Sequence, residues 1–234
     1  MSPAQLPPHA ALFLDLDGTL IDIAPTPDSV VVPDDLPPSL SALRRRLGDA
    51  LAIVSGRPIA QIEALLPNAA YAVVGEHGYA IRAHPGGPEE CAPVALLQDG
   101  LEAAARALIA SHPGALFEPK ARGFVLHYRL APQSGPAIEA ALRGWLEGST
   151  TYRVGQAHMA WEVKPIGIDK GRAVRELMKA PPFAGRTPVF IGDDVTDEDG
   201  MAEARRQGGL GWRVQEMFGD AAGVRAWLRG EREN

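Results

Sequence analysis

The sequence contains a single cysteine, and this scarcity limits what the chain can be. Cys91 has no partner for an internal disulfide, which is typical of a protein that folds in a reducing compartment. Its acidic neighbours Glu89 and Glu90 oppose formation of the thiolate, so we do not expect Cys91 to act as a nucleophile.

Positive charge and long apolar runs are also scarce. The 234 residues carry a net charge of −6, so no basic surplus is available to bind nucleic acid. No apolar run approaches the ~20 residues of a membrane span. Residues 1–10 also lack the basic and apolar regions of a signal peptide. We therefore expect a soluble, cytoplasmic monomer with no nucleic-acid or membrane partner.

Four apolar runs of strand length pass directly into glycine and polar residues. They are ALFLDLD (11–17), ALAIVSGR (50–57), YAVVGEHG (71–78) and TPVFIGDD (187–194). Nearly continuous apolar character is typical of parallel strands that are covered on both faces. Helical patterns follow or precede these runs at 36–47, 58–66, 167–180 and 196–206. The alternation predicts a doubly wound, Rossmann-like α/β core.

The polar residues at the ends of these runs are the candidate site. In such sheets ligands bind outside the carboxyl ends of the strands, so the four polar clusters should converge there. Two helix starts are also predicted near the site. Asp169 is a candidate N-cap, and Thr196 and Asp199 have the spacing of a capping box.

The middle of the chain follows a different pattern. It turns rich in proline and glycine at 85–90, and two helical and four strand-like segments then follow in the order αββαββ. We expect an inserted, smaller α/β domain at 84–162, an open-faced sandwich with both helices on one side of an antiparallel sheet. The core would then comprise residues 1–83 and 163–234. A turn is predicted at Gly155–Gln156.

Period-two alternation separates the faces of the inserted sheet. Apolar side chains, among them Phe124, Leu126 and Trp161, lie on one side, where the helices should cover them. The open side then presents His127, Arg129, Glu162 and Lys164, with Lys120 nearby. Such a face is ordinarily only solvated, but an insertion beside a catalytic crevice has a surface to present to a substrate.

The polar residues at the strand ends suit phosphoryl transfer. A carboxylate such as Asp15 can attack phosphorus, and Asp17 could protonate the leaving oxygen and then activate water. Mg²⁺ suits carboxylates combined with phosphate oxygens. The remaining candidate contacts to the phosphate are Thr19, Ser55, Gly56 and Lys170. Arg57 could contact the substrate or pair with a neighbouring acid.

The motifs DLDGT (15–19), Ser55, Lys170 and GDD (192–194) resemble those of the haloacid dehalogenase-like (HAD) phosphatases. The resemblance implies that Asp15 is the nucleophile and Asp17 the general acid and base. It also implies Mg²⁺ bound by Asp15, the Asp17 carbonyl and Asp193, with Asp194 beside it. The insertion is similar to the larger, C2-type cap of that superfamily.

Within the superfamily, GDDVTDED (192–199) is similar to the acidic signature of trehalose-6-phosphate phosphatases, as are SGRPIAQIEALL, HYR (127–129) and WEVKP. This resemblance implies that Lys120, Arg129 and Glu162 contact the sugar. Three positions depart from the pattern of that family: Lys164, Gln156 and Ala80, where Arg, Lys and Glu are more usual. Lys164 keeps the positive charge, so it stays among the candidate substrate contacts.

Other functions stay open at this point. The same chemistry could act on sucrose 6-phosphate or on a glucosyl- or mannosylglycerate phosphate. A phosphomutase fits less well, although a related cap occurs there. A protein that only binds a ligand would have no need of both Asp15 and Asp17.

Overall fold

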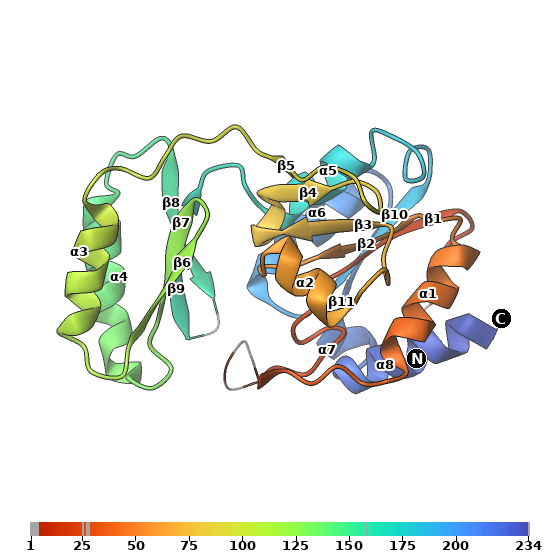
Figure 1. The fold of residues 1–234 in the computed structure, drawn as a ribbon, viewed down its shortest axis with the longest axis horizontal. Coiled ribbons are helices and arrows are strands. Elements are labelled where there is room, and N and C mark those ends of the chain that lie inside the picture. The colour runs from red at the N-terminus through yellow and green to blue at the C-terminus, as the bar shows by residue number, and fades with distance from the viewer. Residues whose placement is uncertain (1–4, 25, 27–28, 158, 234) are drawn as a thin grey trace. The chain divides into compact units, whose positions relative to one another are not determined.

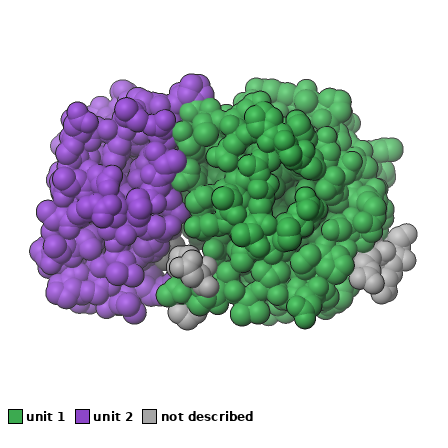
Figure 2. Space-filling model, in the orientation of Figure 1, with its two compact units in different colours: residues 1–92, 169–234 green, residues 93–168 purple. Residues whose placement is uncertain are grey.

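The chain forms two compact units, coloured separately in Figure 2. A computed structural model describes residues 5–24, 26, 29–157 and 159–233. Unit 1 comprises residues 1–92 and 169–234, and unit 2 comprises residues 93–168. These boundaries differ from the expected 84–162 because the chain up to residue 92 still pairs with the sheet of unit 1, while the last strand of unit 2 continues past 162.

Unit 1 is built on a seven-stranded sheet with the strand order β11-β10-β1-β2-β3-β4-β5. Its strands are β1 (Ala10–Leu14), β2 (Leu51–Val54), β3 (Ala72–Gly75), β4 (Ala80–Arg82), β5 (Glu90–Cys91), β10 (Thr187–Gly192) and β11 (Leu210–Arg213). Its α-helices are α1 (Leu36–Arg46), α2 (Ile59–Leu65), α5 (Lys170–Leu177), α6 (Glu198–Arg206), α7 (Val214–Met217) and α8 (Ala221–Glu233). The strands from β11 to β3 are parallel, and β4 and β5 are antiparallel additions at one edge.

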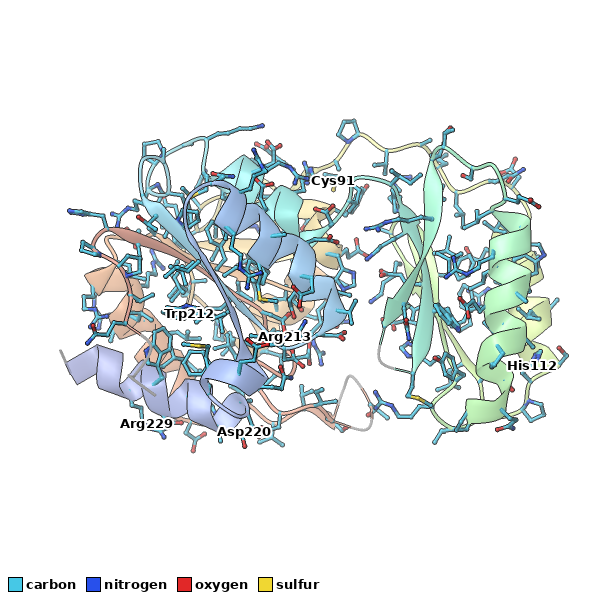
Figure 3. The ribbon with its side chains drawn as sticks, turned by 180° about the vertical axis from the view of Figure 1, so that it is seen from behind. Cys91, His112, Trp212, Arg213, Asp220 and Arg229 are labelled. Atoms are coloured by element: carbon cyan, nitrogen blue, oxygen red, sulfur yellow. The ribbon has the colours of Figure 1, made fainter. Side chains whose placement is uncertain are left out.

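Helices cover both faces of the parallel strands, which explains why β1 is apolar throughout (Figure 1). On one face, Phe13 and Phe190 pack with Phe183 and with residues of α5 and α6. Helices α1 and α8 pack against each other in another layer. The rings of Trp212, Phe218 and Trp227, the last of which lies in α8, contact one another. Trp212 is labelled in Figure 3. The predicted doubly wound α/β core is confirmed.

Unit 2 is a four-stranded antiparallel sheet with the strand order β6-β7-β9-β8 and two helices on one face (Figure 1). In chain order its elements are α3 (Leu101–Ala110), β6 (Leu116–Lys120), β7 (Gly123–His127), α4 (Gly135–Trp145), β8 (Tyr152–Ala157) and β9 (Ala160–Pro165). Phe124, Leu126 and Trp161 form its core together with residues of α3 and α4, as the alternation predicts.

The predicted turn at Gly155–Gln156 is wrong. Both residues lie within β8, where they pair with Glu162 and Trp161 of β9, and the chain reverses only after Ala157. His158 lies outside the described residues. A glycine was the turn signal, but here it continues the strand because the cross-strand pairs extend beyond it.

Within the described residues, no helix is both long enough and apolar enough to span a membrane. Cys91 is exposed on β5 (Figure 3). The first four residues of the N-terminal segment considered above lie outside the described residues.

Candidate active site

The candidate site lies at the carboxyl ends of the parallel strands in unit 1. Strand β1 lies between β2 and β10, so the chain leaves it on one side and returns on the other. Ligands of open α/β sheets bind where the strand order switches in this way. Asp15 follows β1, Ser55 follows β2 and Asp193 follows β10, so all three meet at this edge.

Asp15 is buried and held by two side chains. The Lys170 ammonium donates to Oδ1 at 2.6 Å, and the Thr19 hydroxyl donates to Oδ2 at 3.1 Å. The Asp15 backbone N–H donates to the Ile191 carbonyl at 3.0 Å, which ties the residue to β10. A carboxylate in this position is tolerated because it is paired, and its orientation is fixed by contacts on both oxygens.

Lys170 is the first residue of α5, and the predicted N-cap Asp169 is confirmed, since its carboxylate accepts from the Arg172 N–H at 2.8 Å. The buried Lys170 ammonium donates at 2.6 Å to Asp15 and at 2.6 Å to Asp197. Burial alone would lower the pKa of Lys170, but the two carboxylates outweigh it and raise the pKa above its usual value. Lys170 is therefore a fixed positive charge between two acids.

The acidic loop after β10 is organised by Asp197, which is fully buried. Its Oδ2 accepts from the backbone N–H of Asp193 at 3.1 Å and of Asp194 at 3.0 Å, while its Oδ1 accepts from Lys170. The capping box therefore joins Asp194 and Asp197, and the prediction of Thr196 with Asp199 is wrong. The predicted spacing of three residues was right, but both positions were two residues too far along the chain, because several acids in this loop can satisfy that spacing.

Three carboxylates converge here against one ammonium. One oxygen each from Asp15, Asp193 and Asp197 lies within 4.8 Å of the others. Burial raises the pKa of Asp15 well above its usual value, and the charge of Asp197 adds to the shift. The same two causes raise the pKa of Asp193 to about 6. Such a surplus of negative charge fits a divalent cation with hard oxygen ligands.

Asp15 and Asp193 are the better candidate ligands of such a cation. Both oxygens of Asp197 are already occupied by Lys170 and by two backbone N–H groups. Gly18 has φ +87°, and a Cβ there would lie 2.3 Å from the Asp193 carboxylate. The loop that follows Asp15 can thus approach Asp193 only with glycine at this position.

Asp17 forms an ion pair with Arg57. Of the two roles expected for Arg57, contact with the substrate or pairing with a neighbouring acid, the structure shows the pairing. The guanidinium donates through Nε and Nη2 to the two carboxylate oxygens, each at 2.7 Å. Arg57 is mostly buried, whereas about a third of the Asp17 side chain is exposed, 12% against 34%. The bidentate pair holds the Asp17 carboxylate in one orientation while leaving it accessible.

The loops after β2 and β3 are joined by backbone hydrogen bonds. The His77 N–H donates to the Ser55 carbonyl, and the Glu76 N–H donates to the Arg57 carbonyl, both at 3.0 Å. The buried Ser55 hydroxyl accepts from the Arg57 N–H at 3.2 Å. A Cβ at Gly56 would lie 2.4 Å from the His77 ring, so the ring packs directly on this glycine. His77 therefore supports the loop that carries Ser55.

The structure thus brings most of the predicted core residues to one edge of the sheet. They are Asp15, Asp17, Thr19, Ser55, Gly56, Arg57, Lys170 and Asp193. The Asp194 carboxylate is not among the converging acids, since it accepts from the Val195 N–H at 2.7 Å. Asp197 was missed, although an acid four residues after Asp193 was visible in GDDVTDED.

The remaining predicted residues lie in unit 2, and all but Arg129 lie on the face of its sheet that the helices do not cover. Glu162 and Lys164 are buried and form an ion pair at 3.2 Å. Lys120 donates to Glu118 at 2.6 Å. Arg129 is exposed beyond the end of β7, so the strand alternation that placed it on this face does not reach it.

Glu118 is a second residue that sequence reasoning missed. It lies two positions before Lys120 on β6, and His127 contacts it at 2.7 Å. Burial opposes ionisation of Glu118, but the His127 hydrogen bond and the Lys120 charge lower its pKa to about 2. The alternation that selected Lys120 would also have selected Glu118, because both side chains point to the same face.

Known proteins share both the sequence and the fold of this chain. The sequence matches the trehalose-phosphatase family over residues 13–222. A trehalose-6-phosphate phosphatase of Escherichia coli is 38% identical over 212 residues, 90% of this chain and 79% of that protein. A probable trehalose-phosphate phosphatase of Sinorhizobium fredii is 40% identical over 205 residues, 87% of this chain and 77% of that protein.

Two solved structures have a fold similar to that of this chain. The C-terminal domain of a C. albicans trehalose-6-phosphate phosphatase matches with a TM-score of 0.78 and 19% identity, over 96% of this chain and 92% of that chain. A sucrose-phosphatase from Synechocystis matches with a TM-score of 0.56 and 17% identity, over 94% of this chain and 96% of that chain.

The parallel sheet, the acids at its carboxyl edge and these solved structures define a HAD-type phosphatase fold. The chain is a phosphoric monoester hydrolase. It belongs to the trehalose-phosphatase family, as its motifs led us to expect.

Proposed function

We propose that this chain hydrolyses trehalose 6-phosphate to trehalose and phosphate. The observation that carries the proposal is the buried cluster at the end of β1, where Asp15 is oriented by Lys170 and Thr19 and lies two residues before the accessible Asp17. Relatives that share 38% and 40% of their residues with it over most of their length carry names that state this substrate.

In the proposed reaction, an oxygen of Asp15 attacks the phosphorus and the bond from phosphorus to the sugar oxygen breaks. Asp17 supplies the proton that the departing sugar oxygen takes up. A water molecule then attacks the phosphorus of the aspartyl-phosphate and gives its proton to Asp17, which releases phosphate and restores Asp15. In the interval between these two proton transfers, the bidentate contact with Arg57 holds the Asp17 carboxylate in position.

Mg²⁺ is the proposed cofactor. Asp15, Asp193 and the Asp17 carbonyl would bind it, and the close approach of Gly18 to the Asp193 carboxylate supports this assignment. Bound there, the ion would neutralise charge on the transferred phosphoryl group. Asp197 orients Asp193 through its backbone and keeps Lys170 in place, so it acts by positioning other groups.

Unit 2 is the proposed cap that selects the sugar. The groups at the end of β1 can bind phosphate, but they are not suited to distinguish one sugar from another. Glu162 is an acceptor for sugar hydroxyls, and Lys164 and Lys120 provide positive charge on the same sheet face. Arg129 is the remaining candidate for a substrate contact.

A substrate panel and a trapping experiment test the proposal together. Trehalose 6-phosphate should be hydrolysed faster than sucrose 6-phosphate, glucose 6-phosphate and a glucosylglycerate phosphate. On trehalose 6-phosphate, Asp17→Asn should slow both steps, because Asp17 serves both the departing oxygen and the attacking water. On 4-nitrophenyl phosphate, whose leaving group needs no proton, the variant should complete the first step and lose the second, so a hydroxylamine-sensitive phosphoprotein should accumulate. Asp15→Asn should form none while remaining folded.

Two outcomes would overturn separate parts of the proposal. Preference for another sugar phosphate would mean that the substrate is misassigned while the chemistry stands. Substantial steady-state turnover by purified Asp15→Asn, after deamidation has been excluded by mass spectrometry, would remove Asp15 as the nucleophile.

A further inference from the structure

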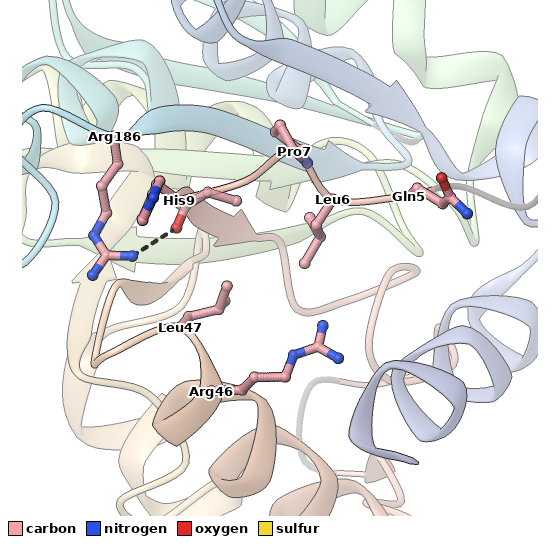
Figure 4. Close-up of a pocket in the computed structure, with 8 residues that line it drawn as sticks. Gln5, Leu6, Pro7, His9, Arg46, Leu47 and Arg186 are labelled. Atoms are coloured by element: carbon pink, nitrogen blue, oxygen red, sulfur yellow. Dashed lines mark hydrogen bonds between the residues drawn. The ribbon is translucent and has the colours of Figure 1, made fainter. Parts of the chain in front are cut away.

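A second concave site lies at the amino end of the sheet in unit 1 (Figure 4). Its volume is about 520 Å³, which is within the range of about 300–1,000 Å³ that is usual for small-molecule sites. The walls come from three separate segments: the N-terminal strand entry at His9, the end of α1 at Arg46, and Arg186 just before β10.

The charged residues that line this pocket are all potential cations. Arg46, Arg186 and His9 contribute to the walls, and none of the described residues that line the pocket is a carboxylate. Guanidinium groups bind phosphate through paired N–H donors, so the lining suits an anion with several oxygens.

Arg186 is fixed at the wall by the backbone. Its Nη1 donates to the Ala10 carbonyl at 3.3 Å, drawn as the dashed line in Figure 4. This bond uses one of the five N–H groups of the guanidinium. Because the acceptor is a neutral carbonyl at the start of β1, the bond positions Arg186 without cancelling its charge.

Part of the remaining wall is apolar, and Gln5 adds a further polar side chain. Leu6, Pro7 and Leu47 line the same pocket, and Leu47 is buried. Inorganic phosphate would leave these surfaces unused, whereas an organic group attached to the phosphate would cover them. The combination of guanidinium groups and apolar walls suits a phosphate ester better than a bare ion.

The pocket is separate from the proposed active site. Ala10 begins β1 at the pocket, and Asp15 follows the other end of the same strand. At about 3.3 Å per residue, the five-residue separation corresponds to about 17 Å. A ligand in the pocket is therefore too far away to be the ester that Asp15 would attack.

We propose that this pocket is a second ligand site, which binds a small phosphate ester through Arg46 and Arg186 and receives its organic part against Leu6 and Leu47. The site is independent of the proposed catalytic function, since it shares no residue with it. It also gives a role to Arg46 of the basic run at 44–46, which lines the pocket; Arg44 of the same run pairs with Asp49.

Phenylphosphonate is a suitable probe, because it carries an oxyanion and an apolar ring and cannot be hydrolysed. Calorimetric titration of the double variant Arg46→Gln/Arg186→Gln is compared with the matched control Arg45→Gln, which alters the exposed neighbour in the same run. Both proteins keep the catalytic cluster, so binding there is common to both titrations and cancels from the comparison.

The control should show a binding event that is absent from the double variant, or that is at least tenfold weaker in it. A crystal of the unaltered protein soaked with phenylphosphonate should show the compound between Arg46 and Arg186. Identical titrations for the two proteins overturn the site. Equal affinity of the pocket for inorganic phosphate overturns the assignment of an ester. If the double variant does not fold, the single variant Arg46→Gln serves instead, because it keeps the bond from Arg186 to Ala10.

Discussion

Asp197→Asn is the substitution that most directly tests how the acidic cluster is held together. The change preserves shape and replaces one carboxylate oxygen by an NH₂ group. In the structure both oxygens are acceptors, one for Lys170 and one for the backbone N–H groups of Asp193 and Asp194. Whichever way the amide turns, its NH₂ group faces a donor, and at least one buried donor loses its acceptor.

The expected loss of stability follows from these contacts. A hydrogen bond to a charged group contributes about 1.5–3 kcal/mol, and breaking a buried ion pair costs about 3–5 kcal/mol. Lys170 keeps its second partner, Asp15, at 2.6 Å, so its charge does not become uncompensated. We therefore expect the free energy of unfolding to fall by about 2–4 kcal/mol. At about 2–4 °C per kcal/mol, the Tm should fall by about 4–16 °C.

Thermal unfolding of metal-free protein measures this effect, and Asp194→Asn is the matched control. The Asp194 carboxylate accepts from the Val195 N–H and takes part in the capping box with Asp197. The side-chain oxygen of asparagine can accept in its place, since asparagine caps a helix about as well as aspartate. The control should therefore stay within about 0.5 kcal/mol of the unaltered protein. If Asp197→Asn is equally mild, Asp197 does not anchor the cluster, and the description of the site given above is wrong.

The other predictions concern the metal, the pH and the sugar. Chelation should abolish activity, Mg²⁺ should restore it and Ca²⁺ should inhibit it; full activity after exhaustive chelation would rule the metal out. In a calorimetric titration, Asp193→Ala should bind Mg²⁺ at least tenfold more weakly. Because the Asp193 pKa is raised to about 6, its carboxyl is protonated below that pH and protons compete with Mg²⁺. The Kd for Mg²⁺ should therefore rise as the pH falls from 7 to 5, and a constant Kd would contradict this. Glu162→Ala should lower kcat/KM for trehalose 6-phosphate by about tenfold to a hundredfold, the effect of a lost charged hydrogen bond, and should spare a small aryl phosphate. A parallel fall on both substrates would mean that Glu162 supports the fold instead.

The strand ends could be predicted from the sequence because two signals coincide there. Each apolar run gives a buried parallel strand, and each run ends abruptly in glycine and acids or hydroxyls. The topology of parallel sheets then brings these ends to one edge without any knowledge of side-chain contacts. Asp169 could also be predicted, since an N-cap depends on a local hydrogen bond three residues along the chain.

The roles of the acids in the loop after β10 could not be assigned in this way. Five acids lie within GDDVTDED, and local spacing permits more than one capping box. The one that turns inward is Asp197, because Lys170 from α5 and the N–H groups of Asp193 and Asp194 all point to it. That choice depends on a contact 27 residues apart in sequence, which no local pattern contains.

The errors in unit 2 have a similar cause. Gly155 was read as a turn, yet it pairs with Glu162 in the middle of two six-residue strands. Arg129 was assigned to a face by extending the alternation of β7, but that strand ends at His127. In both places the length of a strand is decided by its neighbour, and a single segment does not reveal how far the pairing extends.

The distribution of charge at the end of β1 gives a physical reason for the proposed metal. Asp15, Asp193 and Asp197 supply three negative charges when ionised, and Lys170 supplies one positive charge that two of them already share. Arg57 is paired with Asp17, so that pair adds no net charge. A phosphate group would therefore approach a site with a surplus of about two negative charges and would be repelled. A divalent cation removes that surplus and at the same time opposes the protonation that burial imposes on Asp15 and Asp193. We infer that the charge balance of the whole cluster sets the requirement for a cation. Asp197→Asn should therefore weaken Mg²⁺ binding, even though both oxygens of Asp197 are already occupied and it does not bind the ion directly.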